Sequence, residues 1–272
     1  MTTTIANGRI EAAFGRLKAE GRKALITFIT AGDPDLPSTK DIILALEEAG
    51  ADIIELGVPF SDPMADGPTI QASSERAVKK GTHLKDVLKL VRDVRKETEV
   101  PIVLFGYYNP VFNYGLERFA RDAKAAGADG ALIVDLPPEE AGELKGRLDD
   151  ESLDMVFLLT PTSNAGRMSI VASKASGFIY FVSVTGVTGA RSTVAGDAKS
   201  FVAKIRKTTD LPVGVGFGIS TPAQAKEVSR YADAVIVGSA IVNVIAKNPA
   251  NIKKLIGEVK RFVSSLRSAM DS

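Results

Sequence analysis

Eight short apolar segments alternate with helical patterns along this chain, and this alternation restricts the possible folds more than any other feature. The apolar segments lie at residues 24–30, 51–54, 102–105, 130–134, 155–159, 178–182, 213–216 and 234–237. Helical patterns lie at 38–49, 70–98 with a break near Gly81, 116–126, 138–148, 164–176, 195–208, 222–231 and about 249–270. Nearly continuous apolar strands that alternate with helices are typical of a parallel sheet buried on both faces.

A repeated tetrapeptide supports the same interpretation. Ala-Gly-Ala-Asp occurs at residues 49–52 and again at 126–129, and Tyr-Ala-Asp-Ala at 231–234 is a near relative. Each copy ends a helical pattern and opens an apolar segment, with glycine at the expected end of the helix in the first two. The chain is therefore expected to repeat one helix-to-strand unit.

Chain length decides how these units are expected to assemble. The 272 residues would suffice for two ordinary domains, but they also match a single (β/α)8 barrel. We predict one TIM-barrel domain over residues 1–272, with an extra N-terminal helix at 6–20 that plugs the bottom of the barrel and an extra helix after the second strand. Ser38 is the expected N-cap of the helix at 38–49. A doubly wound open sheet is the alternative, and it requires a reversal of strand order.

Composition narrows the class of protein. Hydrophobic residues make up 45% of the chain and charged residues 25%, with a mean hydropathy of +0.09, as in ordinary globular proteins. Neither a secretory signal nor a bilayer-length apolar run is seen, so we expect a cytoplasmic protein, or a plastid stroma protein after loss of a transit peptide. The 34 basic and 33 acidic residues give a net charge of +1, which argues against nucleic acid as a partner. Without cysteine, disulfides and thiol catalysis are excluded.

Two carboxylates stand out in the segment that follows the second apolar run. Glu55 closes that run, so apolar surroundings are expected to raise its pKa and make it a general acid or base. Asp66 lies eleven positions later in a loop with three prolines and two glycines, and we expect it to move while Glu55 stays fixed. The structural alternative is an ion-paired glutamate and a turn-forming aspartate.

Glycines after the last two strands indicate a phosphate site. Gly216 and Gly218 follow the seventh strand, and Gly238 with Ser239 follows the eighth and opens a helix. Backbone N–H groups at glycines and at a helix N-terminus can hold a phosphate without a basic side chain, and this position is the recurring phosphate site of (β/α)8 barrels. Tight packing is the alternative explanation for the glycines. The small, hydroxyl-rich segment 183–191 has the composition of a mobile lid.

Two other mechanisms can be set aside. The eight strands contain no lysine for a Schiff base, and His83, the single histidine, cannot form a histidine-rich metal site. We expect His83 to be exposed or to cap a helix. With these two mechanisms excluded, the candidate residues favour carboxylate acid–base chemistry on a small phosphorylated substrate.

Residues 54–68 carry the motif Ile-Glu-Leu-Gly-Val-Pro-Phe-Ser-Asp-Pro-Met-Ala-Asp-Gly-Pro, and through it the chain closely resembles the α subunits of tryptophan synthase. The similarity extends from Phe14 to about Val259. Shorter matching motifs lie at residues 30–34, 107–110, 135–137, 183–189, 216–219 and 238–240.

The resemblance implies retro-aldol cleavage of indole-3-glycerol phosphate to indole and glyceraldehyde 3-phosphate. It implies that Glu55 is the catalytic acid/base and that Asp66 holds the indole N–H. The substrate-binding residues that it implies are Phe28, Tyr107, Leu132, Val134, Tyr180, Thr188, Gly189, Gly216, Phe217, Gly218, Ile236, Gly238 and Ser239. Among these, Thr188 would close over Asp66 from the lid, and the aliphatic side chains could equally be barrel core. Val184 departs from family members that carry arginine there.

The resemblance further implies a β-subunit partner in an αββα heterotetramer. Pyridoxal phosphate is expected in that partner, and no cofactor or metal is expected in this chain. Two alternatives stay open at this point: a free-standing indole-releasing lyase of the same family, and a non-catalytic regulatory partner of the β subunit.

Overall fold

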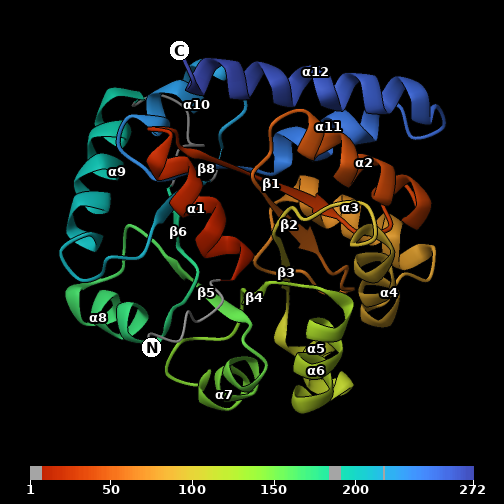
Figure 1. The fold of residues 1–272 in the computed structure, drawn as a ribbon, viewed down its shortest axis with the longest axis horizontal. Coiled ribbons are helices and arrows are strands. Elements are labelled where there is room, and N and C mark those ends of the chain that lie inside the picture. Colours follow the sequence, from red (N-terminus) through yellow and green to blue (C-terminus); the bar gives the residue numbers. More distant parts are fainter. Residues whose placement is uncertain (1–7, 184–190, 217) are drawn as a thin grey trace, which may run out of the picture.

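Eight parallel strands form a closed barrel in chain order in the computed structural model, which describes residues 8–183, 191–216 and 218–272 (Figure 1). The strands are β1 (Ala24–Thr30), β2 (Ile53–Gly57), β3 (Ile102–Gly106), β4 (Gly130–Ile133), β5 (Asp154–Leu159), β6 (Ile179–Val182), β7 (Val213–Gly216) and β8 (Ala234–Val237). Pairing of β1 with β8 closes the barrel, from Ala24 opposite Ala234 to Thr27 opposite Val237. The predicted (β/α)8 fold is confirmed, and the open-sheet alternative is wrong.

Helices surround the barrel and cover its strands. They are α1 (Arg9–Ala19), α2 (Leu36–Glu48), α3 (Pro68–Lys79), α4 (Leu84–Val94), α5 (Tyr108–Tyr114), α6 (Leu116–Ala126), α7 (Gly142–Asp150), α8 (Ala165–Lys174), α9 (Arg191–Ile205), α10 (Pro222–Ser229), α11 (Ser239–Lys247) and α12 (Ile252–Met270). The long α12 packs across α10, α11 and α2, along the top of the view (Figure 1). None of the helices in the described ranges is long and apolar enough to cross a membrane.

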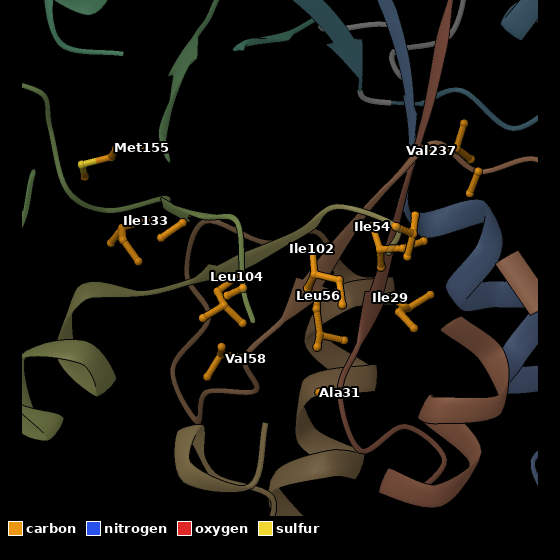
Figure 2. Close-up of a cluster of buried hydrophobic side chains, with 14 of the residues drawn as sticks. Ile29, Ala31, Ile54, Leu56, Val58, Ile102, Leu104, Ile133, Met155 and Val237 are labelled. Atoms are coloured by element: carbon orange, nitrogen blue, oxygen red, sulfur yellow. The ribbon is translucent and has the colours of Figure 1, made fainter. Parts of the chain in front are cut away.

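Side chains of successive strand residues point alternately to the helices and to the barrel interior, as the pleat of a strand requires. Ile54, Leu56, Ile102 and Leu104 belong to the cluster beneath the helices, which Figure 2 shows in part. Residues of the opposite parity form a second, interior cluster: Ala24, Ile26, Ile53, Val103, Leu132, Val156, Phe178, Ala234 and Ile236. An acidic residue at an interior position, such as Glu55, is therefore placed among apolar side chains.

Helix α1 closes the amino-terminal end of the barrel, as expected from its position before the first strand. Its residues Ile10, Phe14 and Leu17 belong to the interior cluster. The rings of Phe14 and Phe178 lie 6.0 Å apart between centroids. The regularly spaced apolar side chains of α1 thus fill the amino-terminal end of the barrel, and the carboxyl-terminal end is left for a site.

Four side chains at the amino-terminal ends of the even-numbered strands bond to the preceding odd-numbered strand. Asp52 accepts a hydrogen bond from the Leu25 N–H at 2.9 Å, and Asp129 accepts one from the Ile102 N–H at 2.8 Å. The corresponding pairs further round the barrel are Ser176 with Met155, and Asp233 with Val213. The repeated Ala-Gly-Ala-Asp motif therefore ends in an aspartate because that side chain satisfies the first free N–H of the neighbouring strand.

The structure confirms some of the predicted helix ends and corrects others. The helical pattern at 70–98 breaks as predicted, with Gly81 at φ +78° between α3 and α4. The N-cap prediction for Ser38 is wrong: Asp35 is the N-cap of α2 and accepts the Ser38 N–H at 2.8 Å. His83 is exposed and is the N-cap residue of α4, with its N–H donated to Asp86.

Helix α5 was not predicted. It has only seven residues and contains Pro110, which weakens a helical pattern in the sequence. Pro110 lies in the first turn of the helix, where a missing N–H removes no intrahelical bond. Gly115, at φ +92°, then separates α5 from α6.

Candidate active site

Glu55 lies on β2 with its side chain in the barrel interior. It pairs in register with Phe28 on β1 and Val103 on β3, and it is 1% exposed. Its Oε1 has no hydrogen-bond partner among the described residues. Burial raises the pKa of Glu55 to about 8, because the apolar surroundings penalise the charged form. A carboxyl group with a pKa near neutral can both donate and accept a proton at working pH.

Asp66 lies in the loop between β2 and α3, directly before the α3 N-cap Gly67. Its Oδ2 accepts a hydrogen bond from the Tyr107 hydroxyl at 3.1 Å. Burial raises the pKa of Asp66, and the Tyr107 bond acts in the opposite direction. A helix N-terminus also favours a negative charge, so α3 adds to the stabilisation of the ionised form.

Both carboxylates line one cavity of about 370 Å³ at the carboxyl end of the strands. Nine of the residues predicted for the site line it: Glu55, Asp66, Phe28, Val134, Tyr180, Gly218, Ile236, Gly238 and Ser239. They come from β1, β2, β6, β8, α11 and the adjoining loops. The barrel therefore brings together residues up to about 200 positions apart in the sequence.

Three of the other predicted residues are described but do not line this cavity. Leu132 is fully buried in the interior cluster and Tyr107 lies behind Asp66, so neither belongs to the described lining. Gly216 is also outside that lining. Thr188, Gly189 and Phe217 lie outside the described residues, so their roles stay predictions.

Gly216 provides space for a tyrosine. A Cβ atom at this position would lie 2.4 Å from the Tyr180 Oη and 3.0 Å from the Ile236 Cβ. Burial, and secondarily the charge of Glu55, raises the pKa of Tyr180. The absence of a side chain at Gly216 therefore lets Tyr180 lie across the interior near Glu55. The sequence suggested this glycine for phosphate binding, whereas the structure gives a packing reason for it.

The apolar part of the cavity contains residues that were not predicted. Phe105, Leu158 and Val182 line it beside Phe28 and Val134. The rings of Phe28 and Phe105 meet edge to face with 5.0 Å between centroids. The alternation of side chains along each strand could have predicted all three. Phe105 is two residues after the interior Val103, Leu158 is two after the interior Val156, and Val182 is two after Tyr180.

The residues of the cavity lining at the start of α11 offer backbone N–H groups. Gly238 is the N-cap of α11 and makes no side-chain capping bond, so the first N–H groups of that helix remain open to a ligand. Gly218, at φ +75°, faces the same cavity with Ser220 and Ser239. The described lining contains no lysine or arginine. A phosphate bound here would be held by helix dipole and backbone donors.

A second hollow of about 510 Å³ lies beside the first, at the ends of β4 and β5. Asp135, Thr160 and Arg167 line it, and it shares Val134 and Leu158 with the cavity of the carboxylates. Neither Glu55 nor Asp66 is among its lining residues, so both carboxylates predicted to be catalytic line the smaller cavity alone. In the described parts of the chain, no group of three or more acidic or histidine side chains is placed to hold a metal ion.

Comparisons with known proteins show the family of the chain. The family model "Tryptophan synthase alpha chain" matches residues 14–271. Curated relatives of that name include one from Geobacter sulfurreducens, 60% identical over 96% of this chain and 98% of the relative, and one from Geotalea uraniireducens, 61% identical over 96% and 97%.

Solved structures give the same result. Tryptophan synthase subunit alpha from Legionella pneumophila superposes with a TM-score of 0.91 at 40% identity, covering 98% of this chain and 99% of that one. A chain of Mycobacterium tuberculosis tryptophan synthase has a TM-score of 0.87 at 37% identity, with coverages of 97% and 98%. With the family model, the curated relatives and the solved structures in agreement, the chain belongs to the tryptophan synthase alpha chain family.

Proposed function

We propose that the chain cleaves indole-3-glycerol phosphate to indole and glyceraldehyde 3-phosphate in tryptophan biosynthesis. Family membership supports this reaction, and the observation that carries it is the buried Glu55, with an unpartnered oxygen, in the same cavity as Asp66. The cavity lining contains the apolar rings of Phe28 and Phe105 and, at Gly238 and the start of α11, backbone N–H donors. A flat indole ring would pack on the apolar rings, and a phosphate group would bind the backbone donors.

The reaction breaks the bond between indole C3 and the glycerol phosphate side chain. A proton is added to C3, and the hydroxyl group next to the broken bond loses its proton to become the aldehyde of glyceraldehyde 3-phosphate. Before the bond breaks, protonation at C3 leaves positive charge on the ring nitrogen, which must be stabilised. The sum of the two products equals the substrate, so no oxidant, water or second substrate is consumed.

The two carboxylates suit these two tasks because their surroundings differ. Glu55, with its pKa raised to about 8, can give a proton to C3 and take one from the hydroxyl. Asp66, bonded to Tyr107 and placed before α3, is the better candidate for the ionised group beside the indole N–H. The described strands contain no lysine for a covalent intermediate, and we propose that the reaction needs no cofactor in this chain.

Membership of the family supports a β-subunit partner in general, and we propose an αββα assembly with pyridoxal phosphate in the β subunit. Two exposed apolar side chains support a docking surface next to the site. Met64 in the Asp66 loop is 90% exposed, and Phe112 on α5 is 60% exposed. Tyr107, at the start of α5, bonds the same loop, so both side chains lie on elements joined to Asp66. A partner that covers them would act on the loop directly.

The test is indole release from indole-3-glycerol phosphate by the purified chain, alone and with a saturating β subunit. We expect measurable cleavage by the chain alone and a higher kcat with the partner, because a contact on the Asp66 loop would favour its competent conformation. Indole would be separated from the substrate by extraction into an organic solvent and quantified, in the absence of serine so that the β subunit does not consume it.

Each alternative predicts another outcome. Full activity that the β subunit leaves unchanged would favour a free-standing lyase. Absence of cleavage with and without the β subunit, together with retained binding to it, would favour a purely regulatory partner and overturn the proposal.

A further inference from the structure

Tyr107 lies behind the catalytic loop. It is the first residue after β3 and the N-cap residue of α5, and it is 5% exposed. Its hydroxyl accepts a hydrogen bond from the Ala65 N–H at 3.0 Å and donates one to the Asp66 Oδ2 at 3.1 Å. One side chain from the barrel therefore holds both the backbone and the carboxylate of two consecutive loop residues.

The same loop is fixed on its other side by α3. The Gln71 amide donates to the Asp66 carbonyl oxygen at 2.9 Å. The Ser74 hydroxyl accepts the Phe60 N–H at 2.8 Å and donates to the Phe60 carbonyl at 2.9 Å. The Phe60 ring packs on the Tyr107 ring, with 5.2 Å between centroids. The contacts from α3 reach only the backbone of the loop, whereas Tyr107 reaches the reactive side chain.

We propose that Tyr107 is a positioning residue that orients the Asp66 carboxylate for the indole N–H. By occupying Oδ2, its hydroxyl leaves Oδ1 for the substrate and restricts rotation of the carboxylate. This role rests on the proposed function. It replaces the direct substrate contact that the sequence suggested for Tyr107, which does not belong to the described cavity lining.

A donated hydrogen bond also keeps Asp66 ionised to lower pH, because it stabilises the charged form. The other titratable groups of the described cavity lining are Glu55 on β2 and Tyr180 on β6. On α3, Arg76 is engaged by Asp33 through two hydrogen bonds, of 2.8 and 2.7 Å. Among the described residues, no cation contributes to the pKa of Asp66, so loss of the Tyr107 hydroxyl would raise that pKa.

The test is Tyr107→Phe, which keeps the ring on Phe60 and removes both hydrogen bonds. A matched control is Tyr114→Phe, since Tyr114 makes the same kind of bond to Asp122, at 2.8 Å, on the outer surface. We expect Tyr107→Phe to lower kcat by about 10- to 100-fold, as for loss of a hydrogen bond to a charged group. KM should stay within about threefold, and the acid limb of the kcat/KM profile should move to higher pH. The control should leave all three unchanged.

A double variant separates positioning from a general loss of structure. In an Asp66→Asn background, Tyr107→Phe should cost less than threefold, because the group that it orients is already changed. If Tyr107→Phe lowers kcat equally in both backgrounds, or leaves the acid limb where it was, Tyr107 acts only through folding and the proposal is overturned. Failure of the proposed function would appear separately, as wild-type protein without cleavage activity.

Discussion

At the scale of single residues, Glu55 is buried and its Oε1 has no hydrogen-bond partner among the described residues. Burying a polar group in this way lowers the stability of the fold. A neutral glutamic acid tolerates this environment far better than a glutamate. The folded protein therefore holds a proton at pH values where the unfolded chain has released it. Wild-type stability should fall as pH rises from the unfolded value of about 4.5 towards the folded value of about 8.

Glu55→Gln should remove this pH dependence, because glutamine has a similar shape and no charge. Relative to wild type, the variant should gain roughly 3–5 kcal/mol in free energy of unfolding between pH 5 and pH 9, at about 1.4 kcal/mol per unit of pKa shift. Urea unfolding at the two pH values measures the difference. Glu75→Gln, at an exposed position paired with Lys79, is the control. Parallel behaviour of Glu55→Gln and wild type would show that Glu55 titrates normally.

The sequence was informative about both carboxylates but not about what holds them. Glu55 comes at the end of an apolar run in the sequence. Because side chains alternate along a strand, Glu55 points into the barrel interior like Ile53, two residues before it. The Tyr107 contact with Asp66 joins residues 41 positions apart, and its partner atoms are chosen by the folded loop. Gly216 was assigned to phosphate because a glycine pattern does not reveal which neighbouring side chain occupies the free space.

At the scale of secondary-structure elements, the aspartates before β2, β4 and β8 connect strands in pairs. Asp129 shows the arrangement most fully: besides the Ile102 N–H, it accepts from Arg95 at 3.0 Å and Arg9 at 3.1 Å. Its side chain is only 7% exposed. The tetrapeptide repeat predicted a repeated turn. Which strand each aspartate would bond to could not be predicted, because that depends on the order of the strands in the barrel.

Asp129→Ala should lower the free energy of unfolding by about 3–5 kcal/mol, because the Ile102 N–H loses its acceptor and the largely buried Arg95 loses its carboxylate partner. Chemical denaturation of the purified variant measures this, and KM of the folded fraction should not change. Asp93→Ala, which removes an exposed pair with Lys96, is the matched control and should fall within about 1 kcal/mol of wild type. Equal effects of the two substitutions would show that the strand connection contributes nothing.

At the scale of the whole molecule, closure of the barrel makes the site. Residues from β2, β6 and β8 meet only because β1 pairs with β8, which places the first and last strands of the barrel side by side. Eight alternating units and the chain length were enough to predict this architecture. Helix bounds were less well predicted. Asp35 rather than Ser38 is the N-cap of α2, because neighbouring polar residues compete for that position, and α5 was missed because it is short and contains Pro110.

The central claim is that the buried Glu55 transfers the protons of the cleavage. Its most direct test is the kcat for indole release by Glu55→Gln and by wild type at one pH, with saturating indole-3-glycerol phosphate and β subunit. We expect the variant, although folded and still able to bind a glycerol phosphate analogue, to lose about 10²- to 10⁴-fold in kcat. Indole release within about threefold of wild type would contradict the assignment of Glu55 and the mechanism built on it.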